Sequence, residues 1–114
     1  MEDCIFCKIA AKKIPAKVVY EDDRILAFDD IRPQAPIHTL IIPKDHFASL
    51  ADVPAERSDL LADILMAARR VAAGKGLATS GYRIVLNTGR DSGQDVFHIH
   101  FHLLGGRRMT WPPG

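Results

Sequence analysis

The segment H-I-H-F-H-L-L-G-G, residues 98–106, constrains the fold more than any other part of the chain. Histidine alternates with large apolar residues, and successive side chains of a β-strand point to opposite faces of the sheet. On a strand, His98, His100 and His102 therefore share one face, and the apolar residues between them share the other. The pattern predicts a strand whose apolar face enters the core and whose three imidazoles line an exposed or cleft-facing edge.

The rest of the chain supplies more strands and one long helix. Short β-prone runs predict strands at Val18–Glu21, Ile25–Phe28, His38–Ile42 and Tyr82–Asn87, with a fifth at Val96–Leu104. A short helix over 5–13 is expected to end before Pro15. Apolar residues recur at helical spacing between Pro54 and Ala73, namely Leu60, Leu61, Ile64, Leu65, Ala68, Val71 and Ala72.

The sequence also indicates where the long helix begins and ends. Asp52 or Ser58 is a candidate N-cap, and Gly74 and Gly76 would end the helix. The element order β-β-β-α-β-β, with hairpin-length connections, predicts an α+β fold with a five-stranded antiparallel sheet. We expect residues 1–114 to form a single domain.

Composition limits the class of protein. Apolar residues make up 47% and charged residues 25% of the 114 residues, as in ordinary globular domains. The net charge is +1, so no general attraction to nucleic acid or to an anionic membrane is expected. The N-terminal residues resemble no signal peptide, and no apolar stretch approaches the roughly 20 residues of a membrane span. We therefore expect a cytoplasmic location.

Three interpretations of the histidine strand compete. The histidines could simply tolerate a half-polar face, although such faces usually mix Thr, Lys and Glu. All three could bind one catalytic zinc, but the outer two are rooted roughly 13 Å apart on a straight strand. One neutral imidazole could instead be a nucleophile toward phosphorus, with its neighbours determining which nitrogen is free.

The two cysteines, Cys4 and Cys7, have the C-x-x-C spacing of half a tetrahedral zinc site. A thioredoxin-type redox role is less well supported, because that motif follows a strand and residue 4 leaves no room for one. Two free thiols without a role are the remaining alternative.

Motifs along nearly the whole chain resemble the histidine-triad (HIT) family of nucleotide-binding proteins. They are H-I-H-F-H-L-L, F-x-K-I, E-D-D-R-x-L-A-F, D-I-R-P-Q-A-P-I-H, I-I-P-K-x-H, G-Y-R-I-V-L-N and the closing G-G-R-x-M-x-W-P-P-G. The closing motif is similar to the nucleoside-phosphoramidase branch, called Hint, rather than to the dinucleoside-polyphosphate branch. The resemblance implies a homodimer whose sheets join across the interface, and hydrolysis of the P–N bond of purine nucleoside 5′-phosphoramidates through a nucleotidyl-histidine. Aminoacyl-adenylates are included in the expected substrates.

The resemblance also implies roles for particular residues. His100 would be the nucleophile, with His102 and His38 orienting it and binding around the phosphate of an AMP- or GMP-type nucleotide. Asp30 would accept the ribose hydroxyls, and Trp111 would reach the partner's active site. The base pocket would be formed by Phe6, Ile9, Phe28 and Ile31, and the phosphate contacts by Asn87, Gly93, Gln94, Asp95 and Val96.

From the residues alone, these assignments have simpler alternatives. Asp30 could cap the proline-containing loop at 30–37, Asn87 could be a turn residue, and the apolar residues could be ordinary core. Asp95 departs from the family pattern, because animal members of the branch have serine there. Its carboxylate either turns away from the phosphate, or is protonated and supplies the proton to the leaving amine.

In certain HIT proteins, mainly bacterial, the same C-x-x-C occurs with two histidines and binds zinc. The resemblance therefore implies a closed structural zinc site formed by Cys4, Cys7, His46 and His98, with no open position for water. Two other functions remain open at this point. One is a nucleotide-sensing or interaction module with slow turnover, and the other is a dinucleoside polyphosphate hydrolase.

Overall fold

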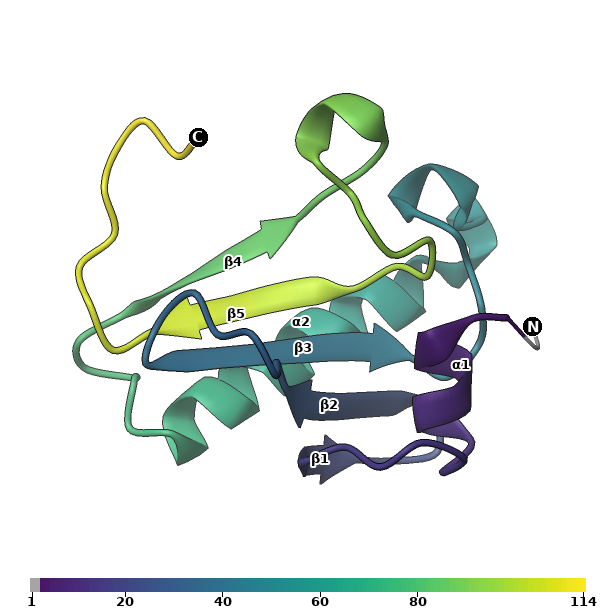
Figure 1. Cartoon of the computed structure of the whole chain (residues 1–114), viewed down its shortest axis with the longest axis horizontal. Helices are drawn as coiled ribbons and strands as arrows, with labels where there is room; N and C mark the ends of the chain where they lie inside the picture. The colour runs from purple at the N-terminus through teal and green to yellow at the C-terminus, as the bar shows by residue number, and fades with distance from the viewer. Residues whose placement is uncertain (1–2) are drawn as a thin grey trace.

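The computed structural model describes residues 3–114 and shows an antiparallel five-stranded sheet with the strand order β1-β2-β3-β5-β4 (Figure 1). The strands are β1 (Val18–Glu21), β2 (Ile25–Asp29), β3 (Ile37–Pro43), β4 (Tyr82–Leu86) and β5 (Phe101–Gly105). The helices are α1 (Ile5–Ala10) and α2 (Ser58–Gly74), with short 3-10 turns η1 (Leu50–Asp52), η2 (Ala55–Arg57) and η3 (Arg90–Ser92). The α+β class and the antiparallel sheet are as predicted.

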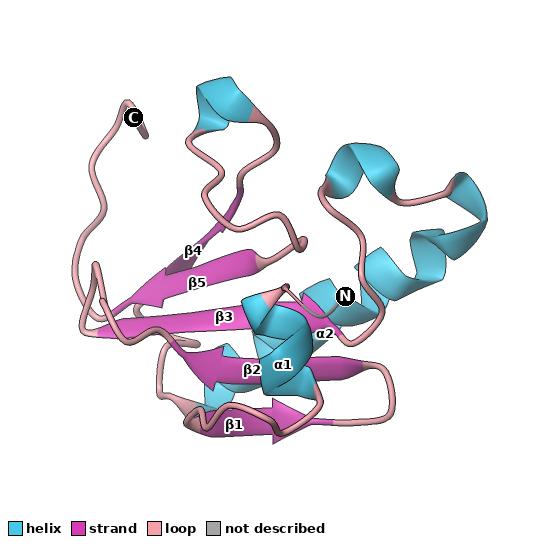
Figure 2. Ribbon diagram, turned by 45° about the vertical axis from the view of Figure 1, so that its right-hand side comes forward, coloured by secondary structure: helices cyan, strands magenta, loops and turns pink. Residues whose placement is uncertain are grey.

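The two helices cover opposite faces of the sheet (Figure 2). Alternation along β2 sends Ile25 and Ala27 toward α2, and Leu26 and Phe28 toward α1. The α2 side holds the larger core, and the α1 side a smaller cluster with Phe6 and the other apolar residues of that face. The face under α1 is the one that carries the histidines.

The long helix differs from the prediction at its start and along its stripe. Arg57 is the N-cap residue and makes no side-chain capping bond, whereas Ser58 is already helical. Asp52 lies in η1, where its carboxylate accepts a hydrogen bond from Ser49 Oγ at 3.0 Å, so both candidate caps are wrong. Leu65 is 41% exposed and does not belong to the buried stripe, because the buried arc of α2 passes through Ala67 instead.

The last strand is shorter than predicted, since β5 begins at Phe101 rather than Val96. Antiparallel pairing of Ile41 with Phe101 would bring Pro43 opposite Ile99, and proline has no N–H to donate. The N–H of Ile99 donates instead to the carbonyl of Phe47, at 2.7 Å. The histidine segment is therefore partly strand and partly an irregular segment held by the loop after β3.

Among residues 3–114, no helix is both long enough and apolar enough to cross a membrane.

Candidate functional site

Alternation predicted an exposed or cleft-facing edge for the three histidines, and the exposed alternative is wrong. His98 and His100 are buried in the irregular segment before β5, and His102 is half-buried within β5. Helix α1 covers them, because the Phe6 ring lies edge-on to His100 with a centroid distance of 5.2 Å. Buried imidazoles need defined hydrogen-bond partners, and those partners determine where each proton resides.

His100 has its proton on the nitrogen that faces the backbone. Its Nδ1 lies 2.8 Å from the carbonyl oxygen of His98, which can only accept a hydrogen bond. Nδ1 is therefore the N–H donor, and in the neutral ring Nε2 keeps its lone pair. That lone pair points toward the side of the molecule where Asp95 lies, with Asp95 Oδ1 4.0 Å from Nε2.

A second chain of hydrogen bonds orders His38 and His102. The backbone N–H of Gln34 donates to His38 Nδ1 at 3.0 Å, so the proton of His38 resides on Nε2. His38 Nε2 lies 2.9 Å from His102 Nδ1 and donates to it. The proton of His102 must then be on its own Nε2, which makes this nitrogen a donor.

Both rings of this chain are neutral at physiological pH. Burial lowers the pKa of His38, with a smaller opposing effect of Asp30. Burial, and then the neighbouring His100 and His38, lower the pKa of His102 to about 4. Because both rings are neutral, the hydrogen bond from the Gln34 N–H determines which nitrogen carries the hydrogen in His38 and, through His38, in His102.

The two carboxylate oxygens of Asp30 contact different parts of the site, one the proline-containing loop and the other His38. Oδ1 accepts the N–H of Arg32 at 2.8 Å, so the carboxylate does cap the proline-containing loop. Oδ2 lies 3.5 Å from His38 Nε2. The capping interpretation is thus true of one oxygen, while the other faces the histidine chain.

Gln94 anchors the loop between β4 and β5. Its buried amide accepts the N–H of Gly89 at 2.9 Å and donates to the carbonyls of Ala48 and Val96 at 2.7 and 3.1 Å. Gly93, the residue before Gln94, has a left-handed conformation with φ +85°, which favours glycine. These bonds hold Asp95 at the mouth of the site with its side chain 83% exposed. Asp95 is therefore not turned away from His100.

The apolar residues expected around a base are distributed unevenly. Phe6, Ile9 and Phe28 are buried in one cluster under α1, with the rings of Phe6 and Phe28 5.5 Å apart. Ile31 is 92% exposed beside Asp30 and does not pack in that cluster. Asn87 is half-buried at the end of β4.

Trp111 lies in the C-terminal tail that follows β5. It is 81% exposed, and the Arg83 guanidinium lies 6.0 Å from its ring centroid.

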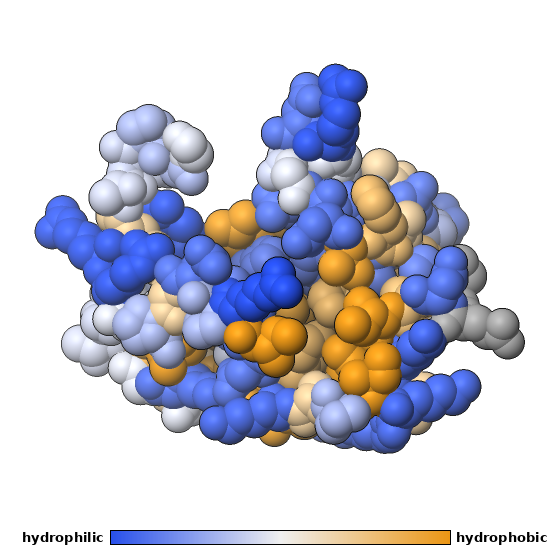
Figure 3. Space-filling model, in the orientation of Figure 1, coloured by the Kyte–Doolittle hydropathy of each residue, from blue (hydrophilic) through white to orange (hydrophobic). Residues whose placement is uncertain are grey.

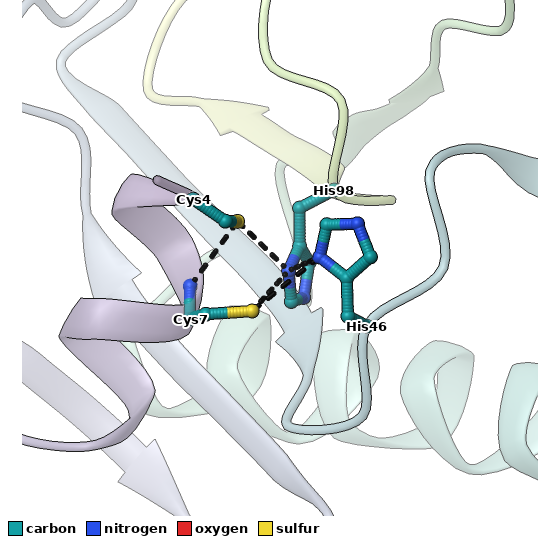
Figure 4. Close-up of side chains that lie close together, drawn as sticks. All are labelled: Cys4, Cys7, His46 and His98. Atoms are coloured by element: carbon teal, nitrogen blue, oxygen red, sulfur yellow. Dashed lines mark hydrogen bonds between the residues drawn. The ribbon is translucent and has the colours of Figure 1, made fainter. Parts of the chain in front are cut away.

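Four metal-ligand side chains lie close together between α1, the loop after β3 and the segment before β5 (Figure 4). They are those of Cys4, Cys7, His46 and His98. Cys4 Sγ lies 3.4 Å from His98 Nδ1, and Cys7 Sγ lies 3.4 Å from His46 Nδ1. The two Nδ1 atoms are 3.1 Å apart, and all four ligand atoms lie within 4.8 Å of one another. The structure therefore brings together the four residues that the resemblance implied.

This donor set fits zinc. Zn–N distances of about 2.0–2.1 Å and Zn–S distances of about 2.3 Å put tetrahedral neighbours about 3.3 to 3.8 Å apart. The N···N and N···S spacings observed here, 3.1 to 3.5 Å, are close to these values. His98 Nε2 lies 2.8 Å from the carbonyl of Pro43 and must donate to it, which leaves the Nδ1 lone pair facing the cluster. Burial lowers the pKa of His98 to about 4, so this ring is neutral as a ligand must be. Burial also raises the pKa of Cys7, with the Cys4 thiol adding to the effect, and metal binding would have to displace that proton.

Asp30, His38 and His102 form a second group of metal-ligand type, but its protons argue against a metal there. A metal bound to His38 Nε2 needs the lone pair of that nitrogen. The Gln34 N–H already occupies the lone pair on Nδ1, so Nε2 carries the hydrogen. We assign this group as a hydrogen-bond chain.

The comparisons with known proteins agree with this geometry. Residues 11–109 match the family model described as HIT domain. The chain belongs to the HIT domain family. A HIT family hydrolase from Legionella pneumophila has the same fold with a TM-score of 0.96 and 60% identity, covering 98% of this chain and 100% of that one. A histidine triad nucleotide-binding protein from Candida albicans superposes with a TM-score of 0.84 at 37% identity, covering 96% and 83%. A 14 kDa zinc-binding protein from Brassica juncea is 51% identical over 114 residues, 98% of this chain and 100% of the relative.

Three groups that order this HIT domain's histidines are not apparent from the sequence. They are the N–H of Gln34, the carbonyl of Pro43 and the carbonyl of His98. All are main-chain groups, which every residue type carries, so no residue pattern marks them. The only available signal was the pair of prolines in 30–37, which indicates a defined loop next to His38.

Proposed function

We propose that this HIT domain hydrolyses the P–N bond of purine nucleoside 5′-phosphoramidates and releases the nucleoside monophosphate. The observation that carries the proposal is the lone pair on Nε2 of His100. A buried imidazole whose Nδ1–H is held by a carbonyl presents the lone pair of Nε2 as the nucleophile, without a separate general base. The Legionella relative is named a hydrolase and the Candida relative a nucleotide-binding protein, which supports both halves of the assignment.

The reaction follows in two steps. His100 Nε2 attacks the α-phosphorus, the P–N bond to the amine breaks, and the electron pair leaves with the amine nitrogen, which takes up a proton. Water then attacks the phosphorus of the nucleotidyl-His100, the P–Nε2 bond breaks, and its electrons return to the ring. The proton that the water loses passes to the group that protonated the amine. His102, as an Nε2–H donor, stabilises the charge that develops on the phosphoryl oxygens.

The nucleotide is held on either side of this centre. In this proposal Asp30 accepts the ribose hydroxyls, and the base contacts Phe6, Ile9, Phe28 and Ile31. Asn87 and the Gly93–Val96 turn face the phosphate. Asp95 lies close enough to the reacting centre to give the leaving amine its proton when protonated.

Two further parts complete the proposal. Zinc held by Cys4, Cys7, His46 and His98 would cross-link the N-terminal segment to the segment that carries His100, a structural role. The protein would be a homodimer whose sheets join at the interface, with Trp111 reaching the partner's site. Metal analysis of the purified protein tests the first part, and less than half an equivalent of zinc per chain with reduced thiols would contradict it.

A His100→Ala variant tests the activity. We expect wild-type protein to release amine from an adenosine phosphoramidate, and the variant to lose at least about a thousandfold in kcat while it still binds AMP. An Asp91→Asn variant, in η3, is the control for a substitution outside the reacting centre.

If neither the wild type nor His100→Ala releases amine while both bind AMP, a nucleotide-sensing module would instead be favoured. Cleavage of diadenosine polyphosphates in preference to phosphoramidates would favour the dinucleoside polyphosphate hydrolase.

A further inference from the structure

A cleft of about 490 Å³ lies next to the reacting centre. Three segments form its walls: the N-terminal residues Asp3 to Ile5, the loop after β3 with His46 and Ala48, and the segment 95–97. Asp95 belongs both to this cleft and to the surroundings of His100 Nε2, 4.0 Å away. The cleft and the reacting centre therefore meet at Asp95.

The walls are fixed to one another before any ligand binds. Gln94 donates to the carbonyl of Ala48 on one wall and to that of Val96 on the other. The Ile99 N–H bonds to the Phe47 carbonyl between the same two segments. The Cys4 and His46 side chains of the cleft also belong to the cysteine–histidine cluster. A preformed cleft binds a ligand without the cost of ordering its walls.

The lining combines apolar surface with negative charge. Ile5 and Phe97 are 47% and 62% exposed there, and Figure 3 shows apolar residues gathered on this side of the molecule, where α1 lies in Figure 1. Asp3 and Asp95 are the charged residues among the eight that line the cleft, and neither Lys nor Arg is among them. An apolar stem with a cation at its end fits this lining, and an anion does not.

We propose that this cleft is the leaving-group subsite, and that it selects phosphoramidates whose leaving amine carries a second, cationic group on an apolar stem. The inference rests on the proposed function and adds the substrate class. The stem packs on Phe97 and Ile5, and the cation lies beside Asp3. Asp95, which borders both the cleft and His100, remains the acid that protonates the leaving amine.

The test compares adenosine 5′-phosphoramidates whose leaving amine has one pentyl stem ending in an ammonium, a methyl or a carboxylate. The unsubstituted phosphoramidate serves as the reference for the reaction itself. We expect kcat/KM to fall in the order ammonium, methyl, carboxylate, by about five- to tenfold at each step at low salt. The ammonium preference should shrink as ionic strength rises, because exposed charges are screened.

Variants locate the effect in the cleft. Asp3→Asn should reduce the ammonium-to-methyl ratio by about threefold and leave hydrolysis of the unsubstituted phosphoramidate unchanged. Asp91→Asn is the matched control, since it removes the same charge from η3, outside the cleft, and should leave the ratio unchanged. Phe97→Ala should slow both the ammonium and the methyl substrate by a similar factor, about fivefold, without affecting the unsubstituted one.

The possible results separate the two proposals. Hydrolysis of the unsubstituted compound with all three stems within twofold of one another would overturn the subsite and leave the proposed function intact. A ratio that responds equally to Asp3→Asn and Asp91→Asn would also overturn it, since the preference would then come from overall charge. No hydrolysis of the unsubstituted compound would overturn the proposed function itself.

Discussion

A methyl group added to Gly105 should destabilise the fold, because this position in β5 has no room for a side chain. A Cβ there would lie 2.5 Å from Cδ1 and 2.9 Å from Cδ2 of Leu77, whereas carbon atoms in contact are about 3.5–4.0 Å apart. Leu77 is 4% exposed and packs in the core under α2, so it cannot swing into solvent. Overpacking of a core by one methyl group costs about 1–3 kcal/mol, and an overlap of this size predicts the upper half of that range.

A double-mutant cycle identifies Leu77 as the cause. Leu77→Ala alone should cost about 2–5 kcal/mol through lost contacts and a cavity. In the Gly105→Ala/Leu77→Ala protein the new methyl no longer meets Leu77 and fills part of the vacated space. The double variant should therefore be at least about 1 kcal/mol more stable than the sum of the single effects predicts.

Urea unfolding followed by far-UV circular dichroism measures all three free energies of unfolding. Gly74→Ala is the matched control, because a Cβ on this residue at the end of α2 meets no atom within 4 Å. The control should be neutral or more stable by up to about 1 kcal/mol. A Gly105→Ala protein within about 0.5 kcal/mol of wild type, or strictly additive effects in the cycle, would refute the reasoning.

Three further predictions concern the histidines and the metal ligands. Because the pKa of His102 is lowered to about 4 in the folded state, the unfolded chain binds its proton more readily, and stability should fall as pH drops from about 6.5 toward 4. For this half-buried group the slope is at most about 1.4 kcal/mol per pH unit, and urea unfolding of His102→Gln should show a flatter dependence. Arg107 donates to the Gln34 carbonyl at 3.0 and 3.3 Å, so Arg107→Ala should loosen the loop whose Gln34 N–H orders His38. We expect kcat to fall roughly tenfold, and Arg107→Lys to restore part of it. The ¹⁵N NMR signature of the His38 tautomer should change as well. Cys7→Ser should abolish stoichiometric zinc and lower the free energy of unfolding by about 3–4 kcal/mol at saturating metal, whereas a chelator should have no effect on the variant.

The strands and the core were predictable because they depend on side-chain pattern. Alternation in 98–106 placed the three histidines on one side of the chain, and the helical spacing between Pro54 and Ala73 located α2. The start of β5 was not predictable, because it depends on Pro43 lying opposite Ile99 in a pairing between distant segments. The N-cap prediction for α2 was wrong for a related reason. The turns η1 and η2 precede the helix, and the Asp52 carboxylate accepts a hydrogen bond from Ser49 instead.

The resemblance to the family identified the candidate residues. Which ring nitrogen of each histidine carries the hydrogen, however, depends on the three-dimensional structure. Each assignment depends on one main-chain group within 3.0 Å of a ring nitrogen, and a sequence records no such distance. The exposure of Ile31 and the position of Asp95 at the mouth of the site likewise depend on loop conformation. These features decide which nitrogen can attack and which group meets the leaving amine.

The irregular segment before β5 explains how one run of histidines can serve two sites. His98 donates through Nε2 to the Pro43 carbonyl, which turns its Nδ1 toward the cysteines. The carbonyl of the same residue accepts the proton of His100 Nδ1, which leaves Nε2 of His100 free. In a regular strand the His98 carbonyl would be directed to a neighbouring strand, and the ring of His100 would lose this acceptor. The early end of the β3–β5 pairing at Pro43 is therefore a condition for the nucleophile, because it releases the main-chain group that sets the tautomer of His100.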